Sequence, residues 1–183
     1  QNAKVAASEL ENVYVVDTRN LSSAEALTIL YAAEMAAEGK EASEIAATAE
    51  EYAKKCDASF VLDTLTYLSK GGRCSSIAAL GANILGIKPC IEVKDGKMGI
   101  CKKYKGKMRA VVVKYIKERL QEADVDNKRV FLTNSGVSED VLEAAYNTLS
   151  ESGIFKEIIM SDAGCVISSH CGPGTLGILF VKK

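Results

Sequence analysis

The stretch "KPCIEVKDGKMGICKKY", residues 88–104, decides the fold. It holds two short runs of apolar and β-branched side chains on either side of Asp95 and Gly96. An Asp-Gly pair between two such runs is a strong signal for a β-hairpin with a two-residue turn. Around this hairpin, helix-like and strand-like segments alternate along the chain. The mixture predicts an α/β fold with a mixed sheet and with helices largely on one face.

Hydrophobic periodicity predicts the other elements. Further strands are expected over residues 12–18, 58–65, 128–135, 155–163 and 175–182. Helices are expected over residues 23–38, 42–55, 74–85, 106–123 and 138–152, and residues 1–11 read as the end of another helix.

The run "NVYVVDT", residues 12–18, is typical of a strand buried on both faces of a parallel sheet. One such strand with its flanking helices cannot close a core of its own. Residues 1–55 are therefore predicted to be the C-terminal part of a truncated first domain, the end of a parallel α/β/α unit. Residues 56–183 are predicted to form a second, two-layer domain with a mixed sheet.

Composition excludes several classes of protein. The chain has 183 residues with 23 basic and 24 acidic side chains, and this balance argues against a nucleic-acid binder. No apolar run approaches the ~20 residues of a membrane span, and no secretory signal is visible. We expect a cytoplasmic protein, with transient membrane contact left open.

The six cysteines form no CxxC pair and fit no zinc template, so no metal site is expected. Free thiols in a reducing compartment are the expected state. Cys171 directly follows His170, the only histidine. Adjacent residues seldom face each other, so a small buried side chain is favoured over a catalytic nucleophile. The cysteines are Cys56, Cys74, Cys90, Cys101, Cys165 and Cys171.

A first candidate site lies in "SKGGRCSS", residues 69–76. Gly71 and Gly72 allow a tight turn and place Arg73 at the start of the following predicted helix. Free N–H groups at a helix start and a guanidinium both favour a carboxylate or phosphate. The alternative is an ordinary loop with a surface ion pair.

A second candidate lies in "HCGPGTLGILF", residues 170–180. Pro173 restricts φ, and Gly172 and Gly174 permit a sharp bend, so His170 is predicted at the mouth of a rigid turn before a buried strand. Its imidazole can donate a hydrogen bond to an anion or act as a base. A structural histidine is the alternative.

The predicted helix over residues 74–85 is rich in small side chains, and its part over residues 77–85 leaves room for a neighbouring helix or for an apolar ligand. The residues proposed to line such a pocket are Ile77, Ala78, Gly81, Ala82 and Leu85. The basic run over residues 102–109 is predicted to be a solvated face, with docking to a phosphorylated ligand or an acidic partner as the alternative.

Four motifs in order carry a resemblance that covers nearly the whole chain. They are "VVDT" (15–18), "FVLDTLTYLSKGGR" (60–73), "LGIKPCIEVKDGK" (85–97) and "HCGPGTLGILF" (170–180). With them the chain resembles the bacterial DegV family, which includes the fatty-acid-binding subunits of fatty acid kinase. The segment "DTRNLSSAEA", residues 17–26, departs from the family pattern because it lacks glycine, so no ligand contact is carried onto it.

The resemblance implies a DegV-like, two-domain α/β protein that binds a long-chain fatty acid. The acyl tail would lie in the C-terminal domain, with Arg73 and His170 at the head group. The protein would need no cofactor and would perform no catalysis itself. It would present the carboxylate to a separate ATP-binding kinase subunit, which forms the acyl phosphate.

Two rival hypotheses remain. The fold also resembles the substrate-binding part of dihydroxyacetone kinases, in which His170 would hold a small ketone covalently. The apolar segment 77–85 and the lack of an evident acid or base beside His170 speak against it. The other rival is a folded fragment without a ligand.

Overall fold

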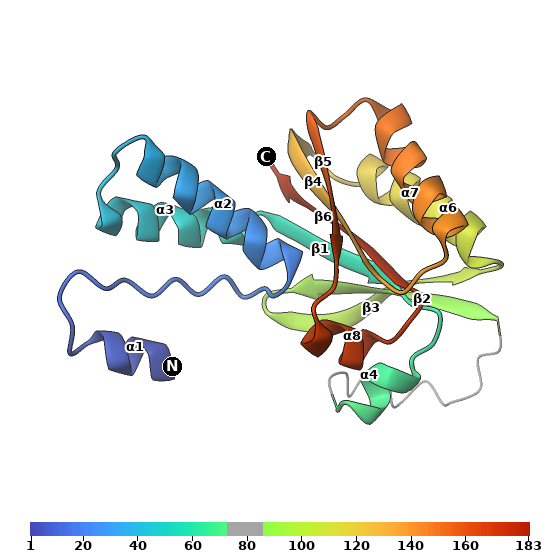
Figure 1. The fold of residues 1–183 in the computed structure, drawn as a ribbon, viewed down its shortest axis with the longest axis horizontal. Coiled ribbons are helices and arrows are strands. Elements are labelled where there is room, and N and C mark those ends of the chain that lie inside the picture. Colours follow the sequence, from blue (N-terminus) through green and yellow to red (C-terminus); the bar gives the residue numbers. More distant parts are fainter. Residues whose placement is uncertain (73–85) are drawn as a thin grey trace.

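The computed structural model describes residues 1–72 and 86–183, which form a mixed α/β structure (Figure 1). Its helices are α1 (Asn2–Ala7), α2 (Ser23–Ala37), α3 (Ala42–Lys54), α4 (Thr66–Lys70), α6 (Met108–Gln121), α7 (Glu139–Ser152) and α8 (Cys165–Cys171). Its strands are β1 (Cys56–Val61), β2 (Ile87–Lys94), β3 (Lys97–Lys105), β4 (Val125–Ser135), β5 (Glu157–Asp162) and β6 (Thr175–Lys182).

The strands form one mixed sheet in the order β3-β2-β1-β6-β4-β5. Neighbouring strands are antiparallel except β4 and β5, which pair in parallel. The predicted hairpin is β2–β3, and its two turn residues have positive φ, 52° at Asp95 and 73° at Gly96. A turn with two positive φ angles matches the twist of paired strands, so the Asp-Gly signal correctly predicted both the turn and the mixed sheet.

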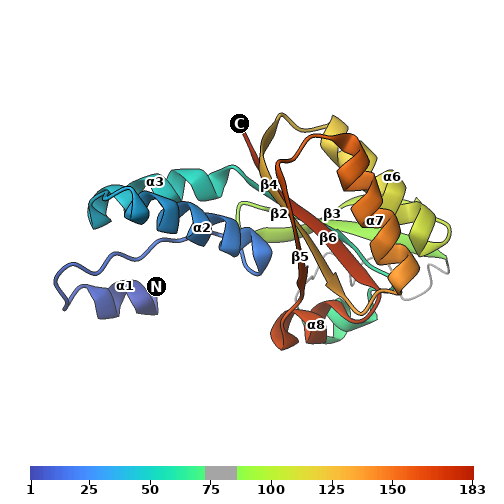
Figure 2. The same cartoon turned by 45° about the horizontal axis from the view of Figure 1, so that its top comes forward.

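The two faces of the sheet are covered differently (Figures 1 and 2). Helices α6 and α7 pack on one face, where alternate residues of the central strand β6, Leu176, Ile178 and Phe180, enter the main core. On the opposite face, Leu179 packs with the first turns of α2, and α4 and α8 pack over the sheet further along. Helices thus contact both faces, whereas the sequence predicted them largely on one.

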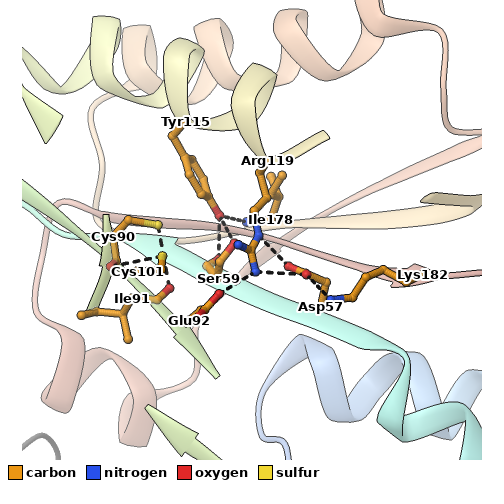
Figure 3. Close-up of polar contacts among 10 residues, drawn as sticks. All are labelled: Asp57, Ser59, Cys90, Ile91, Glu92, Cys101, Tyr115, Arg119, Ile178 and Lys182. Atoms are coloured by element: carbon orange, nitrogen blue, oxygen red, sulfur yellow. Dashed lines mark hydrogen bonds and ion pairs between the residues drawn. The ribbon is translucent and has the colours of Figure 1, made fainter. Parts of the chain in front are cut away.

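The main core includes one polar anchor, Tyr115 of α6. Its ring is buried, and its hydroxyl donates to the Ser59 carbonyl at 2.7 Å and accepts from the Ile178 N–H at 3.1 Å. Burial raises the pKa of Tyr115 well above its usual value, so the hydroxyl stays protonated. The hydroxyl thereby ties α6 to both β1 and β6 (Figure 3).

Tyr115→Phe should therefore lower the free energy of unfolding by about 1–3 kcal/mol, because two buried backbone groups lose a partner. Urea unfolding followed by circular dichroism measures this loss. The control is Tyr146→Phe, since Tyr146 of α7 is 39% exposed and its hydroxyl should matter by less than about 0.5 kcal/mol. Equal stability of the two variants would contradict the prediction.

One predicted strand is wrong. Residues 12–18 form no strand, and Val13 and Tyr14 remain 47% and 49% exposed. A strand needs the backbone of a neighbour, and within the described residues no strand pairs with this segment. The predicted helix at residues 74–85 lies outside the described residues. In the part of the chain that the structure describes, no helix has both the length and the apolar character needed to cross a bilayer.

Two short helices, α4 and α8, were not predicted. No element was predicted over residues 66–70, which form α4, and His170 was predicted at the mouth of a turn, whereas it lies in the last turn of α8. The Gly-Pro-Gly turn follows directly and leads into β6, as expected. Both helices are too short to show a helical apolar period, and they pack against each other through Leu68 and Cys171.

Candidate binding cavity

A cavity of about 200 Å³ lies on the face of the sheet that carries α4 and α8. The sheet supplies one wall, and α4, α8 and the start of α2 surround it. Most of its lining is apolar, with side chains that include Ala58, Phe60, Leu68, Val166, Ile167 and Leu179. A concave apolar surface with few polar groups is the usual form of a small-molecule site.

The floor of the cavity depends on a glycine in the central strand. Gly177 of β6 pairs with Phe60 of β1 and lines the cavity. A Cβ atom at this position would lie 2.7 Å from the Ser59 carbonyl oxygen and 3.0 Å from the Phe60 Cβ. Glycine therefore lets the two strands pair closely and leaves the cavity floor without a side chain.

His170 lines the cavity from the last turn of α8. Its Nδ1 atom is buried and has no hydrogen-bond partner among the described residues. A Cβ atom added at Gly71 would lie 2.3 Å from that nitrogen, so the imidazole packs directly on the Gly71 backbone. A buried polar atom without a partner is costly, which makes His170 a candidate partner for the polar group of a ligand.

The glycines after α8 hold it against α4. Gly172 has φ 78° and ψ 173°, a conformation that is essentially restricted to glycine. Its Cα faces the Tyr67 ring so closely that a Cβ would lie 2.2 Å from Tyr67 Cδ2. A Cβ at Gly174 would similarly lie 2.8 Å from Asp63 Cβ. The turn around Pro173 therefore fixes where α8, and with it His170, lies over the sheet.

Cys171 behaves as the small buried side chain that the sequence favoured. It is 8% exposed, and burial raises the pKa of its thiol to about 11. A thiol is a nucleophile only as the thiolate, so Cys171 is a poor nucleophile near neutral pH.

A polar edge of the cavity was missed by sequence reasoning. The hydroxyls of Ser23, Thr133 and Ser161 form a cluster in which Thr133 Oγ1 lies 2.6 Å from Ser23 Oγ and 2.9 Å from Ser161 Oγ. Beside it, Asn134 Nδ2 donates to Asp162 Oδ1 at 2.8 Å. The sequence signal that could have revealed this edge is the run of polar residues at the ends of β4 and β5. These two strands are parallel, so their carboxyl ends meet at one edge of the sheet, where ligands bind.

The structure brings together some of the predicted site residues. His170 and Gly71, which are far apart in the sequence, are in contact, and Gly172, Pro173 and Gly174 form the turn beside them. Gly72 follows Gly71 with φ 64°. The remaining predicted residues lie outside the described residues: Arg73, Ile77, Ala78, Gly81, Ala82 and Leu85.

Comparison with known proteins identifies the family. A family model described as "Uncharacterised protein, DegV family" matches residues 1–183. A DegV domain-containing protein of Clostridium perfringens is 32% identical over 171 residues, which are 93% of this chain and 58% of that protein. A Thermotoga maritima protein named "Fatty acid-binding protein" is 32% identical over 179 residues, which are 96% of this chain and 62% of that protein.

A solved structure has the same fold. The structure described as fatty acid binding of a DegV family protein from Thermus thermophilus matches with a TM-score of 0.87 and 28% identity, over 100% of this chain and 66% of that one. This chain thus spans 58% and 62% of the length of the two curated relatives. Its fold and its sequence agree with one family along its whole length. The chain belongs to the DegV family.

Proposed function

We propose that this chain is part of a protein that binds a long-chain fatty acid, with the acyl tail in the cavity beneath α8 and the carboxylate beside His170. One observation carries the proposal: an apolar cavity is lined by His170, whose buried Nδ1 has no hydrogen-bond partner among the described residues. The names of the Thermotoga and Thermus relatives point to the same ligand class.

The two ends of a fatty acid make different demands on the site. Burying ~15 methylene groups at ~0.8 kcal/mol each contributes on the order of 12 kcal/mol before ordering costs, so the tail dominates affinity. The carboxylate contributes little net affinity but needs a partner, because an unpaired buried charge is very costly. We assign that task to His170 and to Arg73, which follows Gly71 by two residues.

The acyl-chain pocket is proposed to extend from this cavity to residues 77–85, including Ile77, Ala78, Gly81, Ala82 and Leu85. The described cavity measures about 200 Å³, which is below the ~300 Å³ at the lower end of ligand pockets. We propose the extension because an acyl chain needs more volume than this.

We also propose a division into two domains, with residues 1–55 in the first and residues 56–183 in the second. The proposal is supported by Figure 1, in which α1 and the extended segment after it lie away from the sheet. Val13, Tyr14 and Ile29 are about half exposed, as expected for apolar residues that pack against further parts of a first domain.

The protein is proposed to be non-catalytic and to present its bound acid to a separate kinase subunit. That partner would transfer a phosphoryl group to a carboxylate oxygen and form the acyl phosphate. The presence of His170 in the lining of an apolar cavity supports a head-group role. The rival, a covalent bond from His170 to a small ketone, would need a polar cavity, and the lining is mostly apolar.

The purified protein should carry long-chain fatty acid, which organic extraction and mass spectrometry detect. His170→Ala should keep tail binding within about tenfold of wild type, because the tail supplies most of the affinity, and should lower acyl-phosphate formation with the kinase by a larger factor. The control is Ser169→Ala, an exposed neighbour on α8. Protein without lipid that also fails to bind added palmitate would reject the function, and equal acyl-phosphate formation by wild type and His170→Ala would reject the role of His170.

A further inference from the structure

A pair of cysteines lies on the β2–β3 hairpin, on the opposite face of the sheet from the cavity. In the ladder between these strands, Cys90 pairs with Lys102 and Ile91 pairs with Ile100, so Cys101 is an extra residue, a β-bulge. A bulge places two residues of one strand opposite one residue of the other. Here it brings Cys101 beside Cys90, and Figure 3 shows the two sulfur atoms next to each other.

The contacts of the two side chains differ. The S–H of Cys101 donates to the Cys90 carbonyl at 3.5 Å, and Cys101 is exposed. Cys90 is 2% exposed and packs in the core with Tyr104 and Tyr115. One thiol is therefore accessible to solvent reagents, while its neighbour is shielded from them.

The electrostatics favour a thiolate at the accessible position. A hydrogen bond from the Cys90 side chain lowers the pKa of the Cys101 thiol, and the Arg119 guanidinium lowers it further, whereas burial and Glu92 oppose the shift. The same hydrogen bond, together with burial, raises the pKa of Cys90. Of the two thiols, the exposed Cys101 is therefore the first to lose its proton.

We propose that Cys101 and Cys90 form a peroxide-oxidisable dithiol site, in which Cys101 is oxidised first and Cys90 is the resolving thiol. In the first step the Cys101 thiolate attacks a hydroperoxide oxygen; an S–O bond forms, the O–O bond breaks, and hydroxide leaves and takes up a proton as water. Cys101 is then a sulfenic acid, oxidised by two electrons.

Oxidation leaves no negative charge on Cys101 to raise the pKa of Cys90. In the second step Cys90 loses its proton, and the resulting thiolate attacks the Cys101 sulfur. An S–S bond forms and the S–O bond breaks, and the departing hydroxide takes the Cys90 proton and leaves as a second water. The sum is two thiols and one hydrogen peroxide giving one disulfide and two waters. The product is a covalent link across the edge hairpin that a dithiol reductant reverses.

The test uses the chain with Cys74→Ser and Cys165→Ser, which removes two other thiols that could form mixed products. One equivalent of hydrogen peroxide is added, remaining thiols are blocked with N-ethylmaleimide, and tryptic peptides are mapped by mass spectrometry. Cleavage after Lys94 and Lys97 separates the two cysteines, so a cross-linked peptide pair is diagnostic. We expect a loss of about 2 Da, a Cys90–Cys101 cross-link and reversal by dithiothreitol.

Two variants assign the roles. In Cys90→Ala, Cys101 should accumulate as a sulfenic acid that dimedone traps several-fold more than in the parent protein. In Cys101→Ser, Cys90 should stay reduced, because peroxide does not reach it. Equal dimedone labelling of the parent and Cys90→Ala, or a parent peptide map without the Cys90–Cys101 cross-link, overturns the proposal. The parent map needs no substitution at the buried position, so it decides the matter even if Cys90→Ala is unstable.

Discussion

Arg119→Met is expected to lower the free energy of unfolding by about 3–5 kcal/mol, one of the two largest effects that we predict. The Asp57 side chain is only 3% exposed. Arg119 donates two hydrogen bonds to the Asp57 carboxylate, from Nε to Oδ1 at 2.9 Å and from Nη2 to Oδ2 at 3.0 Å (Figure 3). Its Nη2 also donates to Glu92 Oε2 at 3.1 Å. Without the guanidinium, the remaining partner of the Asp57 carboxylate among the described residues would be Lys182, whose Nζ lies 3.0 Å from Oδ2.

The large loss comes from the charge that remains behind. A buried carboxylate that loses its bidentate partner keeps its full desolvation cost, whereas an apolar pair of similar volume has no such cost. The double variant Asp57→Leu/Arg119→Met should therefore recover most of the lost stability. Recovery by the double variant distinguishes an uncompensated charge from a simple packing defect.

Urea unfolding at neutral pH measures these changes. Arg109→Met is the matched control, because Arg109 is an exposed arginine on the same helix, and a change within about 0.5 kcal/mol is expected. If Arg119→Met lost less than about 1 kcal/mol, or no more than Arg109→Met, the ion pair would not have the role assigned here.

Gly172→Ala should cost on the order of 3 kcal/mol through two separate mechanisms. The backbone at φ 78° and ψ 173° is unfavourable for alanine, and the new methyl carbon would lie 2.2 Å from the Tyr67 ring. The overlap between the added methyl group and the Tyr67 ring is removed only if α8 and α4 move apart. Because His170 lies on α8, we also expect faster release of bound fatty acid.

Two further variants separate these mechanisms. Gly164→Ala, at the other end of α8, has φ −60° and no atom within 4 Å of the added Cβ, so it should change stability by less than about 0.5 kcal/mol. In a Tyr67→Ala background, Gly172→Ala should cost only the backbone part, roughly 1–2 kcal/mol. Thermal unfolding measures the stability of each variant. Release of a labelled fatty acid from the loaded protein measures how fast the ligand dissociates. A Gly172→Ala protein as stable as Gly164→Ala would refute the argument.

Elements with strong local signals were predicted correctly. The Asp-Gly turn predicted the β2–β3 hairpin, and the helix-like run before Gly39 predicted α2, which ends at Ala37 ahead of a glycine with φ 79°. The strand predicted at residues 12–18 was wrong because strand formation depends on more than a local signal. An apolar run indicates that a segment can pair in a sheet. Pairing also needs a neighbouring strand, and sequence periodicity does not reveal whether one is present.

In the candidate site, too, the sequence indicated single residues but not the contacts between them. The rarity of histidine and the Gly-Pro-Gly turn drew attention to His170, and the paired glycines drew attention to Gly71. Nothing in the local sequence indicated that these two residues touch. The hydroxyl cluster of Ser23, Thr133 and Ser161 was missed because each member is an ordinary strand or helix residue until the sheet brings three distant segments together.

The amino-acid sequence by itself determined the longer helices, the strands of the sheet, the Asp-Gly and Gly-Pro-Gly turns and the family, because φ preferences, hydrophobic period and motif order are properties of neighbouring residues. Only the tertiary structure decided which face of the sheet is hollow, that His170 packs on Gly71, and that Cys101 lies beside Cys90 across a bulge. These juxtapositions depend on strand register and on helix packing over the sheet, which join residues from separate elements, and no local signal encodes them.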